Sequence, residues 1–160
     1  MEVITADTIL DLLAARHAPP EWAFLRELRV GTGYGERNRG RWVRGECEQR
    51  LDAWAINHYP VKNRERVTYE VKVSSGDFAA EVRNPLKRRA GMALSNLFYF
   101  VAPEGIINPI RILRLPAGCG LLVVRDMPVG LVVKEVVPAP WRDTPPPPWH
   151  FVSAIARRAT

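Results

Sequence analysis

The residues with the clearest chemical potential are Glu70 and Lys72, two positions apart in the run at residues 66–73. That run is rich in β-branched and apolar residues, which predicts a β-strand. Side chains two positions apart on a strand project from one face, at a spacing of about 7 Å. An apolar strand has little reason to place opposite charges on one face unless they share a ligand. A second acid, Asp52, lies upstream in the strand-like run at residues 51–59.

Two carboxylates and a lysine on neighbouring strands could hold a hard divalent cation and activate a water molecule. Mg²⁺ takes oxygen ligands in octahedral geometry and usually combines one or two protein carboxylates with water. Asp52 and Glu70 can supply the carboxylates, and the carbonyl of Val71 a further oxygen. Lys72 would then orient or deprotonate the water, or stabilise charge on a phosphate. The alternative is a cross-strand salt bridge on a solvated face, which needs no ligand.

The elements that must position these residues follow from hydrophobic spacing and turn residues. Runs that are apolar, β-branched or aromatic predict strands at residues 51–59, 65–73, 97–101, 121–124 and 131–137. Helical spacing and capping residues predict helices at residues 6–16, 21–30, 78–83, 86–95 and 151–158. This order of helices and strands predicts an α/β fold, with a central mixed β-sheet flanked by α-helices.

The segment before the first candidate acid combines a predicted helix with a basic loop. The apolar stripe of the helix at residues 21–30 consists of Trp22, Leu25 and Leu28. A glycine-rich run at residues 31–35 ends this helix. Residues 36–50 mix glycine with several arginines and predict a mobile basic loop, with a short strand near residues 41–43.

The chain has 160 residues, which fits a single domain, with a core at about residues 20–137 and a proline-rich linker and C-terminal helix at residues 138–160. Its formal net charge of +6 favours a polyanionic partner. The two cysteines are far apart, which fits a reducing cytosol. No segment resembles a signal peptide or a membrane span. We therefore expect a cytoplasmic protein with no membrane partner.

A strand-borne aspartate, a turn, a Glu-x-Lys strand and a helix follow one another in this chain. The motifs that carry this order are FLRELRVGTGY (24–34), DAWAI (52–56), YEVKVSSGDF (69–78), NPLK (84–87), YFVAPEG (99–105) and LPAGCGL (115–121). The ordered set, over about residues 22–124, resembles the PD-(D/E)xK nuclease superfamily. More narrowly, it resembles a small bacterial and phage branch, some members of which are labelled DNA-repair proteins. The superfamily's usual proline before the first aspartate is absent, since Leu51 stands there.

The resemblance implies a restriction-endonuclease-like core and hydrolysis of DNA phosphodiester bonds with Mg²⁺ or Mn²⁺ as cofactor. By residue match, Asp52 and Glu70 are the implied metal ligands and Lys72 the implied catalytic lysine. Glu27 is the implied helix acid that many members add to the metal site, with Glu21 as its rival. Such a nuclease would show little sequence preference and would act in phage DNA metabolism or DNA repair.

Basic and aromatic residues around these motifs are the candidate DNA contacts, because cationic side chains neutralise backbone phosphates and aromatic rings stack on bases. They are Lys87, Arg88 and Arg83 after the site, Arg29 before the glycines, and Arg41, Arg44 and Tyr34 in the glycine- and arginine-rich segment. Lys87 ranks first because it also matches the resemblance. The alternative for the helical cluster is a solvated face, paired in part with Glu81.

Other functions stay open at this point. A non-catalytic DNA-binding module would keep the nuclease fold without turnover. A nuclease-like subunit of a repair or phage complex would be active only with a partner protein, with residues 131–149 as its docking surface. A lone site cuts one strand, so a double-strand cutter would need a homodimer or two visits to the DNA. The plainest alternative is a basic structural protein in which Glu70 and Lys72 form a salt bridge and nothing more.

Overall fold

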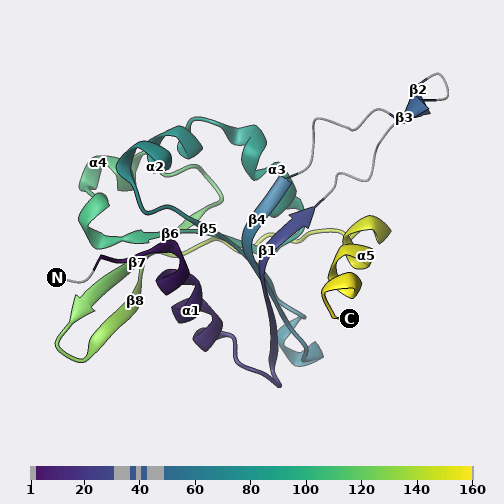
Figure 1. Cartoon of the computed structure of the whole chain (residues 1–160), viewed down its shortest axis with the longest axis horizontal. Helices are drawn as coiled ribbons and strands as arrows, with labels where there is room; N and C mark the ends of the chain where they lie inside the picture. The colour runs from purple at the N-terminus through teal and green to yellow at the C-terminus, as the bar shows by residue number, and fades with distance from the viewer. Residues whose placement is uncertain (1–2, 31–36, 39–40, 43–48, 160) are drawn as a thin grey trace.

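The structure, a computed structural model, describes residues 3–30, 37–38, 41–42 and 49–159. Its centre is a six-stranded mixed sheet (Figure 1). In spatial order the strands are β1 (Trp22–Val30), β4 (Gln49–Asn57), β5 (Arg66–Val71), β6 (Leu97–Pro103), β7 (Gly120–Met127) and β8 (Gly130–Val137). β5, β6 and β7 run parallel to one another, whereas the other neighbouring strands pair antiparallel. A separate two-stranded ribbon pairs β2 (Arg37–Asn38) with β3 (Arg41–Trp42).

Helices pack on both faces of the sheet (Figure 1). The helical elements are α1 (Ala6–Arg16), α2 (Ser75–Val82), α3 (Pro85–Ala93), α4 (Pro109–Leu113) and α5 (Trp149–Arg158), with 3₁₀ turns η1 (Pro60–Lys62) and η2 (Glu104–Ile106). On one face, α1 buries Ile9 and Leu13 against a cluster that includes Tyr69 of β5. On the other face, α2 buries Phe78 and α5 buries Phe151. The sheet is therefore the middle layer of the structure.

The predicted α/β class with a mixed sheet and flanking helices is confirmed. The strands predicted at residues 51–59, 65–73, 97–101, 121–124 and 131–137 correspond to β4, β5, β6, β7 and β8. The helices predicted at residues 6–16, 78–83, 86–95 and 151–158 correspond to α1, α2, α3 and α5. The alternation and the turn residues of these segments thus carried enough information to assign them.

The predicted helix at residues 21–30 is wrong, because this segment forms strand β1. Leu25 and Leu28, three positions apart, lie in one apolar cluster with α5. Trp22 packs in the cluster on the other face of the sheet. An irregularity at Glu27 shifts the alternation of the strand by one residue, so that β1 imitates the spacing of a helical stripe.

The irregularity at Glu27 has a counterpart at Asp52 on the neighbouring strand. The flanking pairs are Arg26 with Ala53 and Leu28 with Leu51. Glu27 and Asp52 therefore occupy facing positions that do not pair. Glu27 has a φ of 50°, in the left-handed region that residues with side chains seldom adopt.

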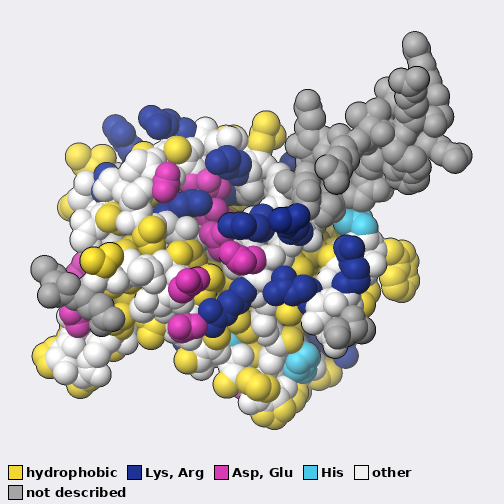
Figure 2. Space-filling view, viewed as in Figure 1, with side chains coloured by type: hydrophobic (Ala, Val, Ile, Leu, Met, Phe, Trp, Pro, Cys, Tyr) yellow, Lys and Arg dark blue, Asp and Glu magenta, His cyan; other side chains and the backbone are white. Residues whose placement is uncertain are grey.

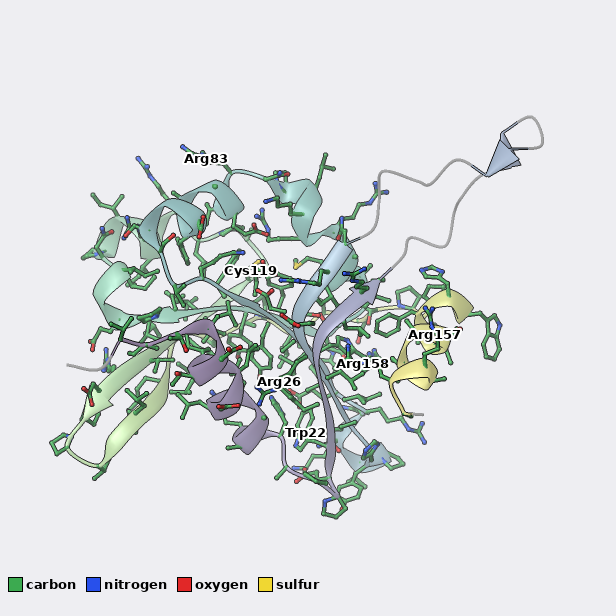
Figure 3. The ribbon with its side chains drawn as sticks, in the orientation of Figure 1. Trp22, Arg26, Arg83, Cys119, Arg157 and Arg158 are labelled. Atoms are coloured by element: carbon green, nitrogen blue, oxygen red, sulfur yellow. The ribbon has the colours of Figure 1, made fainter. Side chains whose placement is uncertain are left out.

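The C-terminal helix α5 contacts the irregular segment of β1 around Glu27 (Figure 3). Nη2 of Arg158 donates a hydrogen bond to the carbonyl of Arg26 at 2.7 Å, and Nη1 donates to the carbonyl of Glu27 at 3.2 Å. Phe151 packs edge-on against Trp54 of β4, with ring centroids 5.0 Å apart. The last helix thus fixes the part of β1 and β4 that carries the two facing acids.

The predicted basic loop at residues 36–50 lies largely outside the described residues. Within it, β2 and β3 are short strands, and β3 covers part of the strand expected near residues 41–43. Among the helices that the structure describes, none has the length and apolar character needed to cross a membrane.

Candidate functional site

The candidate site begins where β4 and β5 separate. The ladder between these strands pairs Ala53 with Tyr69 and goes no further toward Asp52. There the side chain of Asp52 takes the place of a backbone acceptor, since its Oδ2 accepts a hydrogen bond from the N–H of Val71 at 2.8 Å. The N–H and the carbonyl of one strand residue project to the same side of the strand. The carbonyl of Val71 therefore also faces the side of Asp52.

Glu70 and Lys72 form the centre of the site at the end of β5. Nζ of Lys72 lies 2.7 Å from Oε1 of Glu70 and 3.7 Å from Oε2 of Glu81. The three side chains are largely buried, with 14%, 17% and 5% of Glu70, Lys72 and Glu81 exposed. The backbone N–H of Lys72 donates to the carbonyl of Val101, which keeps Lys72 aligned with β6. One buried ammonium group is thus held between a carboxylate of the sheet and a carboxylate of α2.

Glu81 reaches the site because of how α2 begins and packs. The hydroxyl of Ser74 accepts a hydrogen bond from the N–H of Asp77, which caps the helix directly after the Glu-x-Lys strand. Phe78 is buried against Phe100 of β6, with ring centroids 5.6 Å apart. Residues three positions apart share a helix face, so the buried Phe78 turns Glu81 toward the sheet as well.

The charges of this cluster do not balance. Burial raises the pKa of Asp52, although the hydrogen bond from Val71 and the charge of Lys72 oppose the rise. Burial and the charge of Asp52 raise the pKa of Glu70 to about 7, even with Lys72 beside it. Burial alone would lower the pKa of Lys72, but Glu70 and Glu81 reverse the direction and the pKa is raised. Three carboxyl groups therefore share one largely buried lysine among the described residues, in a poorly solvated place that favours their neutral forms until a further cation is bound.

Glu27 comes from strand β1, which corrects the expectation of a helix acid. It occupies the position that faces Asp52. Its side chain is largely exposed, and its Oε1 lies 3.9 Å from Nη2 of Arg50. The rival acid, Glu21, is at the other end of β1, where its Oε1 accepts a hydrogen bond from Nδ2 of Asn57 at 2.9 Å. Of the two, only Glu27 is placed to approach Asp52.

The predicted DNA contacts fall into different environments. Lys87 is exposed, with Nζ 3.7 Å from Oε2 of Glu81, so it borders the cluster. Arg29 is also exposed and pairs in register with Arg50 on β4. Arg83 is exposed on the outer side of α2, pointing away from the sheet (Figure 3). Lys87 is therefore better placed than Arg83 to contact a ligand at the cluster.

The expectation that Arg88 contacts DNA needs correction. Arg88 is buried, its Nη1 donates to the carbonyl of Glu81 at 2.6 Å, and its guanidinium lies over the ring of Phe100. It is occupied in joining α3 to α2. Arg44 and Tyr34 lie outside the described residues, and of Arg41 only the backbone of β3 is described.

The acidic and basic side chains gather on one face of the molecule. Figure 2 shows acidic groups together in the middle of this face, bordered by lysine and arginine side chains. The cluster of Asp52, Glu70, Lys72 and Glu81 is linked by the contacts given above. A phosphate-bearing ligand could thus meet cations at the border and carboxylates at the centre.

The sequence alone did not assign Glu81 to this site. From the sequence, we expect Glu81 to pair with basic residues of the helical cluster. This is true of Lys87, but the structure adds a contact with Lys72. The available signal was its spacing of three from the apolar Phe78 on the helix after the Glu-x-Lys strand. That spacing predicts an inward-facing acid.

The site stands without support from known proteins. Within the described residues, no group of three or more His, Cys, Asp or Glu side chains is arranged to hold a metal ion. Comparison with protein-family models, curated proteins and solved structures finds no match to the chain. The geometry and the charges of the cluster are therefore what indicates a function for the chain.

Proposed function

We propose that the chain is a Mg²⁺- or Mn²⁺-dependent deoxyribonuclease with a restriction-endonuclease-like core, which hydrolyses phosphodiester bonds with little sequence preference. The observation that carries the proposal is a group of three poorly solvated carboxyl groups, those of Asp52, Glu70 and Glu81, with Lys72 as the one largely buried lysine among them in the described part of the chain. Lys87 contacts Glu81 from the exposed border of the group. Desolvated carboxylates without enough counter-charge favour the binding of a cation. A dication would supply that charge.

The donor set fits a hard dication. Among the described residues, Oδ1 of Asp52 makes no hydrogen bond, whereas Oδ2 is engaged by Val71. Glu70 adds a second carboxylate, and the carbonyl of Val71 faces the same side, so that two carboxylates and one carbonyl would share the ion with water. Glu27 stands opposite Asp52 and would have to move toward it to add a third carboxylate. Oxygen ligands of this kind are those that Mg²⁺ and Mn²⁺ prefer. When bound, such an ion supplies a Lewis acid for the phosphate and lowers the pKa of water.

The residues of the chain would bind and orient the substrate around that ion. Lys72 would present its ammonium group to a phosphate oxygen and so stabilise the charge that develops in the transition state. Lys87, Arg29 and Arg50 would hold the DNA backbone at the border of the site. Contacts to phosphates carry no base information, so weak sequence preference and strong dependence on salt are expected.

A cleavage assay with purified protein tests the proposal. The protein is incubated with Mg²⁺ or Mn²⁺ and with single-stranded, double-stranded and branched DNA. Cleavage is expected for at least one of these, and Lys72→Ala should abolish it while DNA affinity stays nearly intact. Glu104→Gln, which removes a carboxylate from the exposed pair with Arg125, is the matched control and should cleave normally. No cleavage of any substrate by the wild-type protein would refute the enzyme.

A second candidate is a DNA-binding module with a nuclease-like fold and no turnover, alone or as a subunit of a repair or phage complex. The observation in its favour is the short contact between Lys72 and Glu70, because each group then has an opposite charge beside it without a metal ion. Calorimetry separates the two functions. Tight DNA binding without uptake of Mn²⁺ would favour the module, whereas saturable Mn²⁺ binding that Asp52→Asn removes would favour the nuclease.

A further inference from the structure

Lys72 has two carboxylate partners, and only one of them is a proposed metal ligand. Its Nζ is hydrogen-bonded to Oε1 of Glu70 at 2.7 Å, and it lies 3.7 Å from Oε2 of Glu81. A cation that binds Glu70 must compete with Lys72 for the same carboxylate. A buried ammonium group that loses its counter-charge is strongly destabilising, so Lys72 needs a second partner at that moment.

We propose that Glu81 is a positioning residue, which takes over Lys72 when Glu70 turns to a divalent cation. This inference rests on the proposed metal-dependent function. Shortening the distance from Nζ to Oε2 by about 1 Å would bring the two groups into hydrogen-bonding range. Glu81 thereby frees Glu70 for the cation and keeps the ammonium group of Lys72 beside the site.

The surroundings of Glu81 suit this role. Its side chain is only 5% exposed, so water does not compensate its charge. Its backbone is fixed from two sides, because its carbonyl accepts a hydrogen bond from Arg88 and the neighbouring turn of α2 is anchored by the buried Phe78. A carboxylate on a fixed backbone can guide a flexible lysine without moving itself.

A purely structural role for Glu81 is the competing explanation. Oε2 of Glu81 also lies 3.7 Å from Nζ of Lys87, and this pair could simply join α2 to α3. In that case, loss of the carboxylate would lower the stability of the metal-free protein and would leave the affinity for a cation unchanged. The positioning role predicts the opposite combination.

Titration calorimetry with Mn²⁺ tests the proposal on the full chain, at a temperature where circular dichroism shows each variant folded. Glu81→Gln is expected to weaken Mn²⁺ binding by about 10- to 100-fold, the range found when residues that orient metal ligands are removed. The melting temperature of the metal-free protein should stay nearly unchanged, because Glu70 still pairs with Lys72. Glu104→Gln removes the same charge from an exposed pair and should leave Mn²⁺ affinity unchanged.

A double-substitution cycle decides whether Glu81 acts through Lys72. In the Lys72→Met background there is no ammonium group to hold, so adding Glu81→Gln should change Mn²⁺ affinity by less than about threefold. An equal loss of affinity in both backgrounds would show that Glu81 acts by its own charge and would overturn the inference. So would an unchanged affinity in Glu81→Gln alone.

Two further outcomes keep the test decisive. If Glu81→Gln does not fold, Glu81→Asp keeps the charge but withdraws the carboxylate from Lys72, and it should still weaken Mn²⁺ binding; wild-type affinity in that variant would overturn the inference. If the wild-type protein itself takes up no Mn²⁺, the proposed function fails and the inference fails with it. Normal Mn²⁺ uptake by both the wild-type protein and Glu81→Gln would refute the inference alone.

Discussion

Two kinds of ion pair occur in this molecule, and they differ in surroundings more than in distance. Lys72 meets Glu70 at 2.7 Å inside the cluster, while Arg26 meets Asp11 at 2.6 Å on the surface. The side chains of Glu70 and Lys72 are 14% and 17% exposed, whereas those of Arg26 and Asp11 are 38% and 71% exposed. The two distances are nearly equal, but the free energy of desolvation differs, because only the buried pair has lost most of its hydration.

The difference between the two ion pairs indicates which of them bears on function. Exposed pairs are screened by water and salt, and their presence says little about activity. The buried cluster keeps an excess of carboxylates that a well-packed apolar core would not need. Retaining that excess at the end of the Glu-x-Lys strand is what suggests a cation-binding role.

Replacing the basic residue of each pair gives the largest expected contrast. Lys72→Met should lower the free energy of unfolding by about 3–5 kcal/mol at pH 8, because it leaves buried carboxylates unpaired. Arg26→Met should change it by at most about 1 kcal/mol, since Asp11 stays hydrated. Urea denaturation followed by circular dichroism measures both. Equal effects of the two substitutions would contradict the distinction between the pairs.

The pH dependence of stability sharpens the same contrast. The pKa of Glu70 is raised from 4.5 to about 7 by burial and by Asp52, so the folded state binds this proton more tightly than the unfolded chain does. The free energy of unfolding should therefore fall as pH rises from 4.5 to 7, by on the order of 2–3 kcal/mol, and then level off. Urea titrations from pH 4.5 to 8 should show this fall in the wild-type protein relative to Glu70→Gln.

The comparison with Glu70→Gln is needed because His17 acts in the opposite direction. Burial and the charge of Arg16 lower the pKa of His17 to about 4, so its contribution to stability is lost as pH falls below 6.5. Subtracting the two pH profiles cancels the part due to His17. A flat difference between the wild-type protein and Glu70→Gln would show that the Glu70 carboxyl is not held protonated by its surroundings.

The sequence predicts those features of the site that depend on neighbouring residues along the chain. Alternation along the predicted strand placed Glu70 and Lys72 on one face, and their side chains are in contact, although Lys72 directly follows the last residue of β5. The apolar run at residues 51–59 placed Asp52 on a strand, and Asp52 lies in β4. The burial of Arg88 was missed, because a basic residue on a short amphipathic helix is usually solvated and its burial depends on Phe100, a residue of another element.

What the sequence could not predict depends on contacts between distant segments. The irregularity at Glu27 faces an unpaired position at Asp52 on β4, and the pattern of a single strand cannot show an irregularity of its partner. The same irregularity gave β1 its apparent helical spacing. The spacing of Glu81 from Phe78 predicts that Glu81 faces inward, but its contact with Lys72 depends on how α2 packs over the end of β5.

Arg158 extends the comparison to an exposed cation that binds backbone carbonyls instead of a carboxylate. Arg158→Gln should lower the free energy of unfolding by about 1–2 kcal/mol, since hydrogen bonds to a charged donor exceed the worth of an exposed ion pair. Amide exchange within residues 26–28 should quicken while Phe151 keeps α5 in place. Arg83→Gln removes the same charge from the outer side of α2 and should leave that exchange unchanged. If both substitutions quicken the exchange equally, the effect of Arg158→Gln comes from the change in net charge and not from the lost hydrogen bonds.

Glu27 offers the smallest effect and the most informative sign. It belongs to an exposed pair with Arg50, which should contribute little to stability, yet its φ of 50° costs a residue with a side chain about 1–2 kcal/mol relative to glycine. Glu27→Gly should therefore raise the free energy of unfolding, by about 0.5–1 kcal/mol, while it weakens Mn²⁺ binding if the acid facing Asp52 takes part in the site. Urea denaturation and calorimetry on the same preparation measure the two changes. If Glu27→Gly is more stable and keeps its full affinity for Mn²⁺, the strained backbone has a role in the fold of β1 alone. Glu27 would then belong with the surface ion pairs and not with the buried cluster.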